Sequence, residues 1–259
     1  MKKTVLALTI LVILGSEFSG SNIIREARAD KITTIHIVTP SWVNQTHKDG
    51  TGLFFDIIRK VYEPVGIKMK FTIVPWKRAK MMIETNQADA RLAVVRTGKE
   101  QVMPEYPLYV DYTVAIFKKD TIRDWKGIET LNGKNAVWMR GYDFHKIHPL
   151  SDIQLEWSEI NSWEQAWEML EHDRVDVYID ALIDIAPYIK HHHIDMTPYR
   201  LETLYSRNAY MNFSESKRSK KLMEIYDKRI IELLHSGELK KCFEKWGVKF
   251  APFKPEKEK

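Results

Sequence analysis

The chain has 259 residues, 44% of them hydrophobic and 29% charged, and Lys plus Arg exceed Asp plus Glu by five charges. This length is enough for one large hydrophobic core or for two smaller ones of about 100 to 150 residues each. The 11% of aromatic residues excludes a largely disordered chain. The densest basic cluster, 217–221, lies at the start of an amphipathic helix and is explained as its solvated face. Nucleic-acid binding is therefore not expected.

The N-terminal 29 residues differ from the rest. Lys2 and Lys3 precede an apolar run over residues 4–14, which is too short to cross a bilayer but has the length of the hydrophobic region of a secretory signal. Residues 27–29 form an A-x-A cleavage site, although cleavage within 15–21 and an uncleaved anchor are alternatives. Cys242 is the single cysteine, so no lipid-accepting Cys follows the run. We therefore predict a signal peptide over 1–29 and a periplasmic protein.

The first half of the chain alternates short β-branched runs with helical periodicity. Strands are predicted at 35–38, 71–74 and 90–95, and a helix at 76–86. Between the first two strands, Phe54, Ile57, Ile58 and Val61 recur at the spacing of one buried helix face. This alternation predicts an α/β fold with mainly parallel sheets.

The second half repeats this pattern on a smaller scale. Strands are predicted at 109–117, 136–138 and 175–179, and Ser162 with Gln165 forms a capping box that opens a helix. Two C-terminal helices end at Gly237 and Gly247. The Lys-, Glu- and Pro-rich segment 252–259 is predicted to be a disordered tail.

Six segments in this order resemble the type II periplasmic solute-binding fold, and specifically the family 3 proteins that include binders of polar amino acids. They are 52–56 (GLFFD), 75–79 (PWKRA), 88–90 (ADA), 96–100 (RTGKE), 175–180 (VDVYID) and 236–239 (SGEL). The resemblance implies two βα lobes joined by a hinge of two chain crossings. Lobe 1 is expected over 30–116 plus 207–251, and lobe 2 over 117–206.

The resemblance also implies a function. Such a protein captures a small polar solute, an amino acid or a related amine or organic acid, and delivers it to the membrane permease of an ABC importer. It is expected to be a monomer without cofactor or enzymatic activity. The alternatives are a soluble sensory subunit, or an enzyme on the same fold such as a dehydratase or a peptidoglycan-cleaving relative, although no nucleophile elbow or metalloprotease motif is present.

Two tryptophans follow strands at positions where the ligand of an open α/β sheet is expected. Trp42 follows the first strand, and Trp76 follows the second. Both are predicted to contact the ligand by stacking or cation–π attraction, with core packing as the alternative. Arg78 is a candidate donor to a ligand carboxylate, with a solvated helix surface as the alternative.

One segment departs from the family pattern. Where amino-acid binders carry the Thr-x-x-Arg carboxylate clamp, this chain has residues 97–100, so Glu100 stands in place of the arginine. Val94 and Arg96 remain candidate ligand contacts beside this segment. The reversed charge leaves open whether the solute is a standard α-amino acid.

In lobe 2 the resemblance places a ligand amine near Asp180, for which a helix N-cap role is the alternative. Arg140, Gly141 and Tyr142 follow a strand where the family presents backbone N–H groups to ligand oxygens, although an ordinary glycine turn explains them equally well. The triple histidine 191–193 is not predicted to bind metal, because consecutive helical residues point in different directions.

Overall fold

The computed structural model describes residues 32–96 and 102–253. All but the first of these residues lie in one compact unit, Thr33–Lys259. The predicted signal peptide and residue 100 lie outside the described residues. Of the predicted tail, Phe253 is described and is buried, with 5% of its surface exposed.

One curled mixed sheet organises this unit, with the strand order β2-β1-β3-β8-β4-β7-β5-β6. β1 pairs in parallel with β2 and β3, and β5 pairs in parallel with β6 and β7, whereas β8 is antiparallel to β3 and β4, and β7 to β4. The strands are β1 Thr34–Thr39, β2 Lys68–Ile73, β3 Ala90–Val95, β4 Tyr109–Lys118, β5 Asn135–Met139, β6 Glu156–Ile160, β7 Val177–Ala181 and β8 Tyr199–Phe213.

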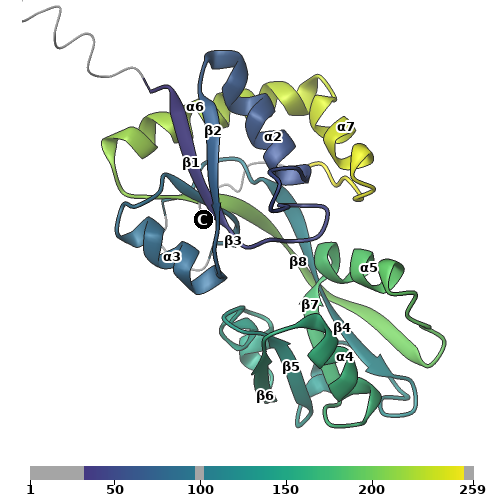
Figure 1. The fold of residues 1–259 in the computed structure, drawn as a ribbon. Helices are drawn as coiled ribbons and strands as arrows, with labels where there is room; N and C mark the ends of the chain where they lie inside the picture. The colour runs from purple at the N-terminus through teal and green to yellow at the C-terminus, as the bar shows by residue number, and fades with distance from the viewer. Residues whose placement is uncertain (1–31, 97–101, 254–259) are drawn as a thin grey trace, which may run out of the picture. The chain divides into compact units, whose positions relative to one another are not determined.

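Two lobes lie at opposite ends of this sheet (Figure 1). Lobe 1 contains β1, β2 and β3 with four helices: α2 Leu53–Tyr62, α3 Trp76–Glu84, α6 Lys217–His235 and α7 Glu238–Lys245. Lobe 2 contains β5, β6 and β7 with α4 Trp163–Glu171 and α5 Leu182–His191. Short 3-10 turns cover Glu63–Val65, Ile128–Leu131, Phe144–Lys146 and Leu150–Asp152.

Each lobe has its own core. In lobe 1, the apolar face of α2 is fully buried at Phe54, Ile57 and Ile58, because the helix packs on α6 and α7. In lobe 2, two buried clusters lie on opposite faces of β5 and β7, one built around Trp167 and the other around Trp138. Two smaller cores are one of the two arrangements that the chain length allowed.

β4 and β8 run through both lobes, and β4 pairs with β8 along its whole length, whereas the last residues of β8 pair with β3. Their register shifts at Thr113 and Val114, which face Tyr205 and Thr203, so Leu204 has no partner and forms a bulge. The two strands therefore connect the lobes, with this irregularity between them. The predicted lobe boundaries, 116/117 and 206/207, lie close to it and stay a prediction.

Most predicted elements are confirmed, and the main correction concerns the sheet. The capping box of α4 is present, since the Ser162 side chain accepts from Gln165 N at 3.3 Å. The expectation of mainly parallel sheets is wrong for the central strands, and β6 and β8 were not predicted. No helix within 32–96 and 102–253 has both the length and the apolar character that crossing a bilayer requires.

Candidate ligand-binding site

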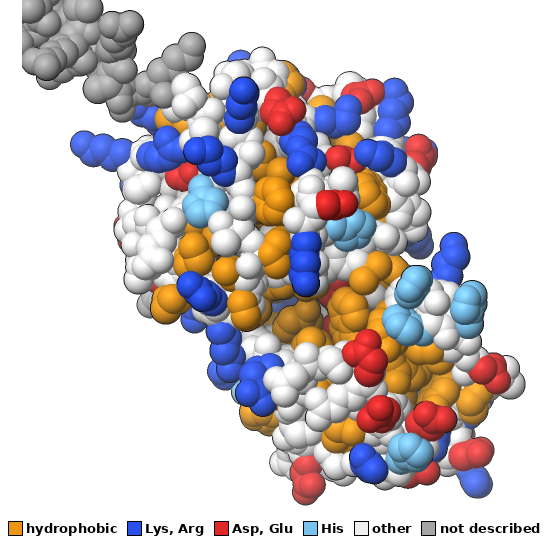
Figure 2. Space-filling view, viewed as in Figure 1, with side chains coloured by type: hydrophobic (Ala, Val, Ile, Leu, Met, Phe, Trp, Pro, Cys, Tyr) orange, Lys and Arg blue, Asp and Glu red, His pale blue; other side chains and the backbone are white. Residues whose placement is uncertain are grey.

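A pocket of about 610 Å³ is lined by residues of both lobes. In Figure 2, hydrophobic side chains gather around the hollow between the lobes. The lining residues are Trp42, Gln45, Trp76, Lys77, Lys80, Arg91, Ala93, Val94, Val95, Tyr109, Asp111, Gly141, Tyr142, Asp143, Phe144, Lys146, Ile147, Ala181 and Asp184. This volume is in the range of small-molecule sites, and the lining combines aromatic rings with charges of both signs.

The loop after β1 is held against the N-terminus of α2. This helix has no side-chain cap, and the N–H groups of Leu53 and Phe54 donate to the carbonyl oxygens of Asn44 and Gln45 at 2.9 and 3.1 Å. Gly52 permits this approach, since its φ is +133° and a Cβ there would lie 2.3 Å from Gln45 O. The capping contacts fix the loop that carries Trp42 and Gln45 into the pocket.

Three aromatic side chains form one wall of the pocket. The ring centroids of Trp42 and Trp76 are 5.8 Å apart, and Tyr142 lies 6.5 Å from Trp76. Trp42 Nε1 donates to the Tyr142 hydroxyl at 3.2 Å, a bond between residues of different lobes. Rings at these spacings give an apolar surface able to stack on a flat or cationic group.

Arg91 is a buried cation on the lobe 1 side of the pocket. Ala93 has a φ of +59°, and the register of β3 against β8 shifts between Arg91 and Val94. This bulge breaks strand alternation, so Arg91, Ala93, Val94 and the next residue all line the pocket. Arg91 Nε donates to Asn212 Oδ1 at 2.9 Å, and its guanidinium lies 4.9 Å from the Trp76 ring centroid.

The Arg91 guanidinium is only partly satisfied. Arg91 is 4% exposed, and one of its two terminal nitrogens, Nη1, has no hydrogen-bond partner among the described residues. Burial lowers the pKa of Arg91 to about 10, and Glu84 is the carboxylate that partly offsets this. A buried donor without a partner costs free energy, which a ligand acceptor would recover.

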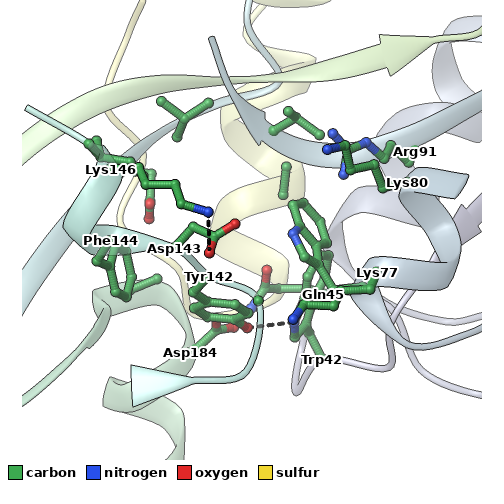
Figure 3. Close-up of a pocket in the computed structure, with 18 of the residues that line it drawn as sticks. Trp42, Gln45, Lys77, Lys80, Arg91, Tyr142, Asp143, Phe144, Lys146 and Asp184 are labelled. Atoms are coloured by element: carbon green, nitrogen blue, oxygen red, sulfur yellow. Dashed lines mark hydrogen bonds and ion pairs between the residues drawn. The ribbon is translucent and has the colours of Figure 1, made fainter. Parts of the chain in front are cut away.

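Three carboxyl groups lie together: Asp180 and Asp184 of lobe 2, and Asp111 on the connecting strand β4. Burial, followed by the charge of Asp180, raises the pKa of Asp111 to about 7. Burial raises the pKa of Asp180 to about 6, and it raises that of Asp184 well above its usual value, with repulsion from Asp180 and Asp111 adding to the effect. Asp184 accepts a hydrogen bond from Gln45 Nε2, the second link between the lobes (Figure 3).

Five of the nine residues predicted from sequence line this pocket: Trp42, Trp76, Val94, Gly141 and Tyr142. The expected role of the Gly141 N–H is already filled, because it donates to Glu159 Oε1 at 2.7 Å. Glu159 also lies 3.9 Å from Lys77 Nζ of lobe 1. Gly141 has a φ of +85°, and a Cβ there would meet the Lys77 side chain at 3.0 Å, so glycine allows α3 to approach this turn.

The other four predicted residues are not among the pocket-lining residues. Arg78 is exposed on α3, and Arg140 is exposed beside Glu159, 3.9 Å away. Arg96 donates to Pro104 O at 3.3 Å and lies over the Tyr210 ring. Asp180 is fully buried behind the pocket.

Asp180 is held in this position by local contacts. β7 continues to Ala181, so Asp180 lies within the strand and not after it. Its carboxylate accepts from the Tyr178 hydroxyl and from Ala181 N. Ala181, and not Asp180, is the N-cap residue of α5.

The charged or polar lining residues that sequence reasoning missed include Gln45, Arg91, Asp111 and Asp184. A signal existed for Arg91 and Asp111, since each is a charge inside a run otherwise typical of a buried strand. Asp184 is the third residue of α5, a position where carboxylates are common and give no functional signal. Among the described residues, no group of three or more His, Cys, Asp or Glu side chains is arranged to hold a metal ion.

Comparisons with known proteins support the fold. No protein-family model matches the sequence, and no curated protein is similar to it at a significant level. Among solved structures, an ancestral arginine-binding protein bound to arginine aligns with a TM-score of 0.68 and 18% identity, over 83% of this chain and 98% of the other. A Streptococcus pneumoniae ABC uptake transporter substrate-binding protein with bound histidine gives 0.69 and 18%, over 85% and 95%.

A third similar structure is the GluR0 ligand-binding core from Nostoc punctiforme in complex with L-glutamate. It aligns with a TM-score of 0.68 and 14% identity, over 82% of this chain and 98% of the other. The shared architecture is the two-lobed type II periplasmic binding fold. The α/β fold with two lobes that the sequence predicted is therefore confirmed.

Proposed function

We propose that this protein is an extracytoplasmic solute-binding protein that captures a small polar solute between its lobes and delivers it to an ABC importer. The observation that supports this most directly is the pocket itself, which lies between two lobes connected by two strands and is lined from both sides. Closure of lobes around a ligand is the usual way in which such a hinged arrangement works. The three structures aligned above are each described with a bound amino acid: arginine, L-glutamate and histidine.

The site favours a polar solute of amino-acid size over a large or wholly apolar one. A pocket of about 610 Å³ accommodates a small molecule. Trp42, Trp76, Val94 and Tyr142 supply apolar contact area in this pocket. No step of chemistry is assigned to the site, and the permease is proposed as the partner of the closed, loaded protein.

The test is a thermal-shift screen of the full chain, expressed with its own N-terminal segment and purified from the extracytoplasmic fraction. The panel contains amino acids, amines and small organic acids. A ligand at 100 times its Kd stabilises the folded state by about 2.7 kcal/mol. At least one solute is expected to raise the melting temperature.

Two tryptophan variants make the screen specific to the pocket. Trp42→Ala should abolish the shift, because it removes an aromatic wall and a bond between the lobes. Trp157→Ala is the matched control, since Trp157 is 44% exposed on β6 and is not among the lining residues. A panel without any hit, or an equal loss of binding in both variants, contradicts the proposal.

A further inference from the structure

Asp184 is a carboxylate that enters the pocket from lobe 2 and meets a neutral partner from lobe 1. It is 4% exposed and lies in the first turn of α5, where the helix N-terminus favours a negative charge. Its hydrogen-bond donor is the Gln45 side-chain amide, which is itself 1% exposed. The amide contributes one N–H and no positive charge, so the carboxylate has a hydrogen bond but no counter-charge there.

Asp111 places a second carboxylate at the same side of the pocket. Its Oδ1 is enclosed and has no hydrogen-bond partner among the described residues. Burial and, after it, the charge of Asp180 raise the pKa values of Asp111 and Asp184, so the three carboxyl groups lie close enough to act on one another. Carboxylates grouped this closely need a positive charge between them to be ionised together.

The nearby cations of the chain have other partners. Arg207 is the cross-strand neighbour of Asp111 on β8, yet its guanidinium lies over the Tyr205 ring, 5.1 Å from the centroid. Lys146 pairs with Asp143 at 3.2 Å. The remaining titratable groups that face the carboxyl groups, from β4, β7, β8 and the turn after β5, are hydroxyls: Tyr109, Tyr178, Tyr205 and Tyr142.

The opposite charge is available on the other side of the pocket. Arg91 has an unpartnered, buried Nη1, and Glu84 is the acidic group that acts on its pKa, not the three aspartates. In Figure 3, Arg91 lies on the lobe 1 side with Lys80, well apart from Asp184. Trp42 and Trp76 line the same pocket. The site therefore has an acidic end and a basic end that do not pair with each other.

We propose that the solute is a dipolar molecule with well-separated charges, whose cationic nitrogen binds Asp184 and Asp111 and whose anionic group binds Arg91. This inference rests on the proposed function and assigns roles to three residues of that site. The cation is an ammonium or a guanidinium, which can add a charged donor beside the Gln45 amide. The anion is a carboxylate, which can pair with the free edge of the Arg91 guanidinium. The aromatic residues contact the chain that joins the two groups.

The experiment is titration calorimetry with three related probes. L-arginine has both charged ends, agmatine lacks the carboxylate, and L-citrulline replaces the guanidinium with an uncharged group of similar shape. L-arginine is expected to bind more tightly than either analogue by about 10- to 100-fold, the range for loss of one charge-assisted hydrogen-bond pair. L-lysine is included as a second separated dipole.

Two variants assign the ends. Asp184→Asn should weaken the binding of L-arginine by about 10- to 100-fold, to an affinity similar to that of L-citrulline. Arg91→Gln should bring L-arginine to the level of agmatine. Asp173→Asn is the control, because Asp173 is exposed, pairs with Lys118 at 2.8 Å and is not among the pocket-lining residues, so binding should stay within about twofold. Circular dichroism melts establish that each variant is folded.

The outcomes separate this inference from the proposed function. If other solutes bind while L-arginine and L-lysine do not, the inference is wrong and the solute-binding function stands. Equal binding of L-arginine and L-citrulline, or an Asp184→Asn variant that binds like the parent, also overturns it. A protein that binds none of the probes and none of the solutes in the wider screen contradicts both.

Discussion

Asp111→Asn should make the unliganded protein more stable at pH 8 and leave its stability nearly unchanged at pH 4. The Asp111 carboxyl has a folded-state pKa of about 7, against an ordinary pKa of 3.8 for this side chain. A carboxyl whose pKa is raised by folding stabilises the folded state fully below the unfolded pKa, near 4, and that stability is lost as pH rises to about 7. Asparagine has nearly the same shape and no charge, so the variant avoids this loss.

The size of the effect follows from the shift. Each pKa unit corresponds to about 1.4 kcal/mol, so a shift of about three units gives about 4 kcal/mol as an upper value. Asp111 lines an open pocket and is only partly buried by surface area, so solvent screening reduces the expected gain to about 2 kcal/mol. For a chain of this length, that is a rise of about 4 to 8 °C in melting temperature.

The assay is a set of thermal melts of dialysed protein at pH 4, 6 and 8, because bound solute would mask the effect. The difference between Asp111→Asn and the parent should grow as pH rises from 4 to 8. Asp143→Asn, at a half-exposed pocket residue already paired with Lys146, should show no such growth. A difference for Asp111→Asn that is independent of pH would refute the claim that an uncompensated carboxylate is buried there.

Two further variants test packing of lobe 1, each by urea unfolding. Gly52→Ala should destabilise the protein by at least about 2 kcal/mol more than Gly66→Ala. Both positions have a positive φ, but only at Gly52 would a Cβ meet the backbone, 2.3 Å from Gln45 O. Equal losses of unfolding free energy in the two variants would contradict the proposed fit of the loop. Tyr62→Phe should cost about 1 kcal/mol, because the variant lacks the hydrogen bond that the buried hydroxyl donates to Leu222 O at 2.9 Å. An unchanged midpoint would show that the bond is not needed.

Sequence patterns predicted the elements that bury one face in a regular period. The apolar spacing of α2 and the cap of α4 are local signals, and both are confirmed. β8 was missed because its sequence, from Tyr199 to Phe213, contains Arg, Glu and Asn and shows no simple alternation. That strand passes from one lobe to the other, so the environment of its two faces changes along its length. Alternation of apolar and polar residues therefore does not mark a single buried face over the whole strand.

The aromatic residues of the site were predictable, and most of its charges were not. Trp42 and Trp76 follow strands, and the carboxyl ends of parallel strands meet at one edge of a sheet. Asp180 and Asp184 are four residues apart across the change from strand to helix, and the exact end of β7 decides which of them enters the pocket. Element boundaries are the least predictable feature of a sequence, because local energies differ little over one or two residues.

Arg91 and Asp184 have in common that folding buries a charge for which the chain offers too few partners. Arg91 keeps an unpaired Nη1, and Asp184 has an amide where a cation would neutralise it. Replacing either by a well-packed neutral residue would be expected to stabilise the unliganded fold, as for other incompletely compensated buried charges. A site selected for stability alone would not keep both. Their presence on opposite sides of one pocket is explained if a ligand with two separated charges supplies the missing partners when the lobes close.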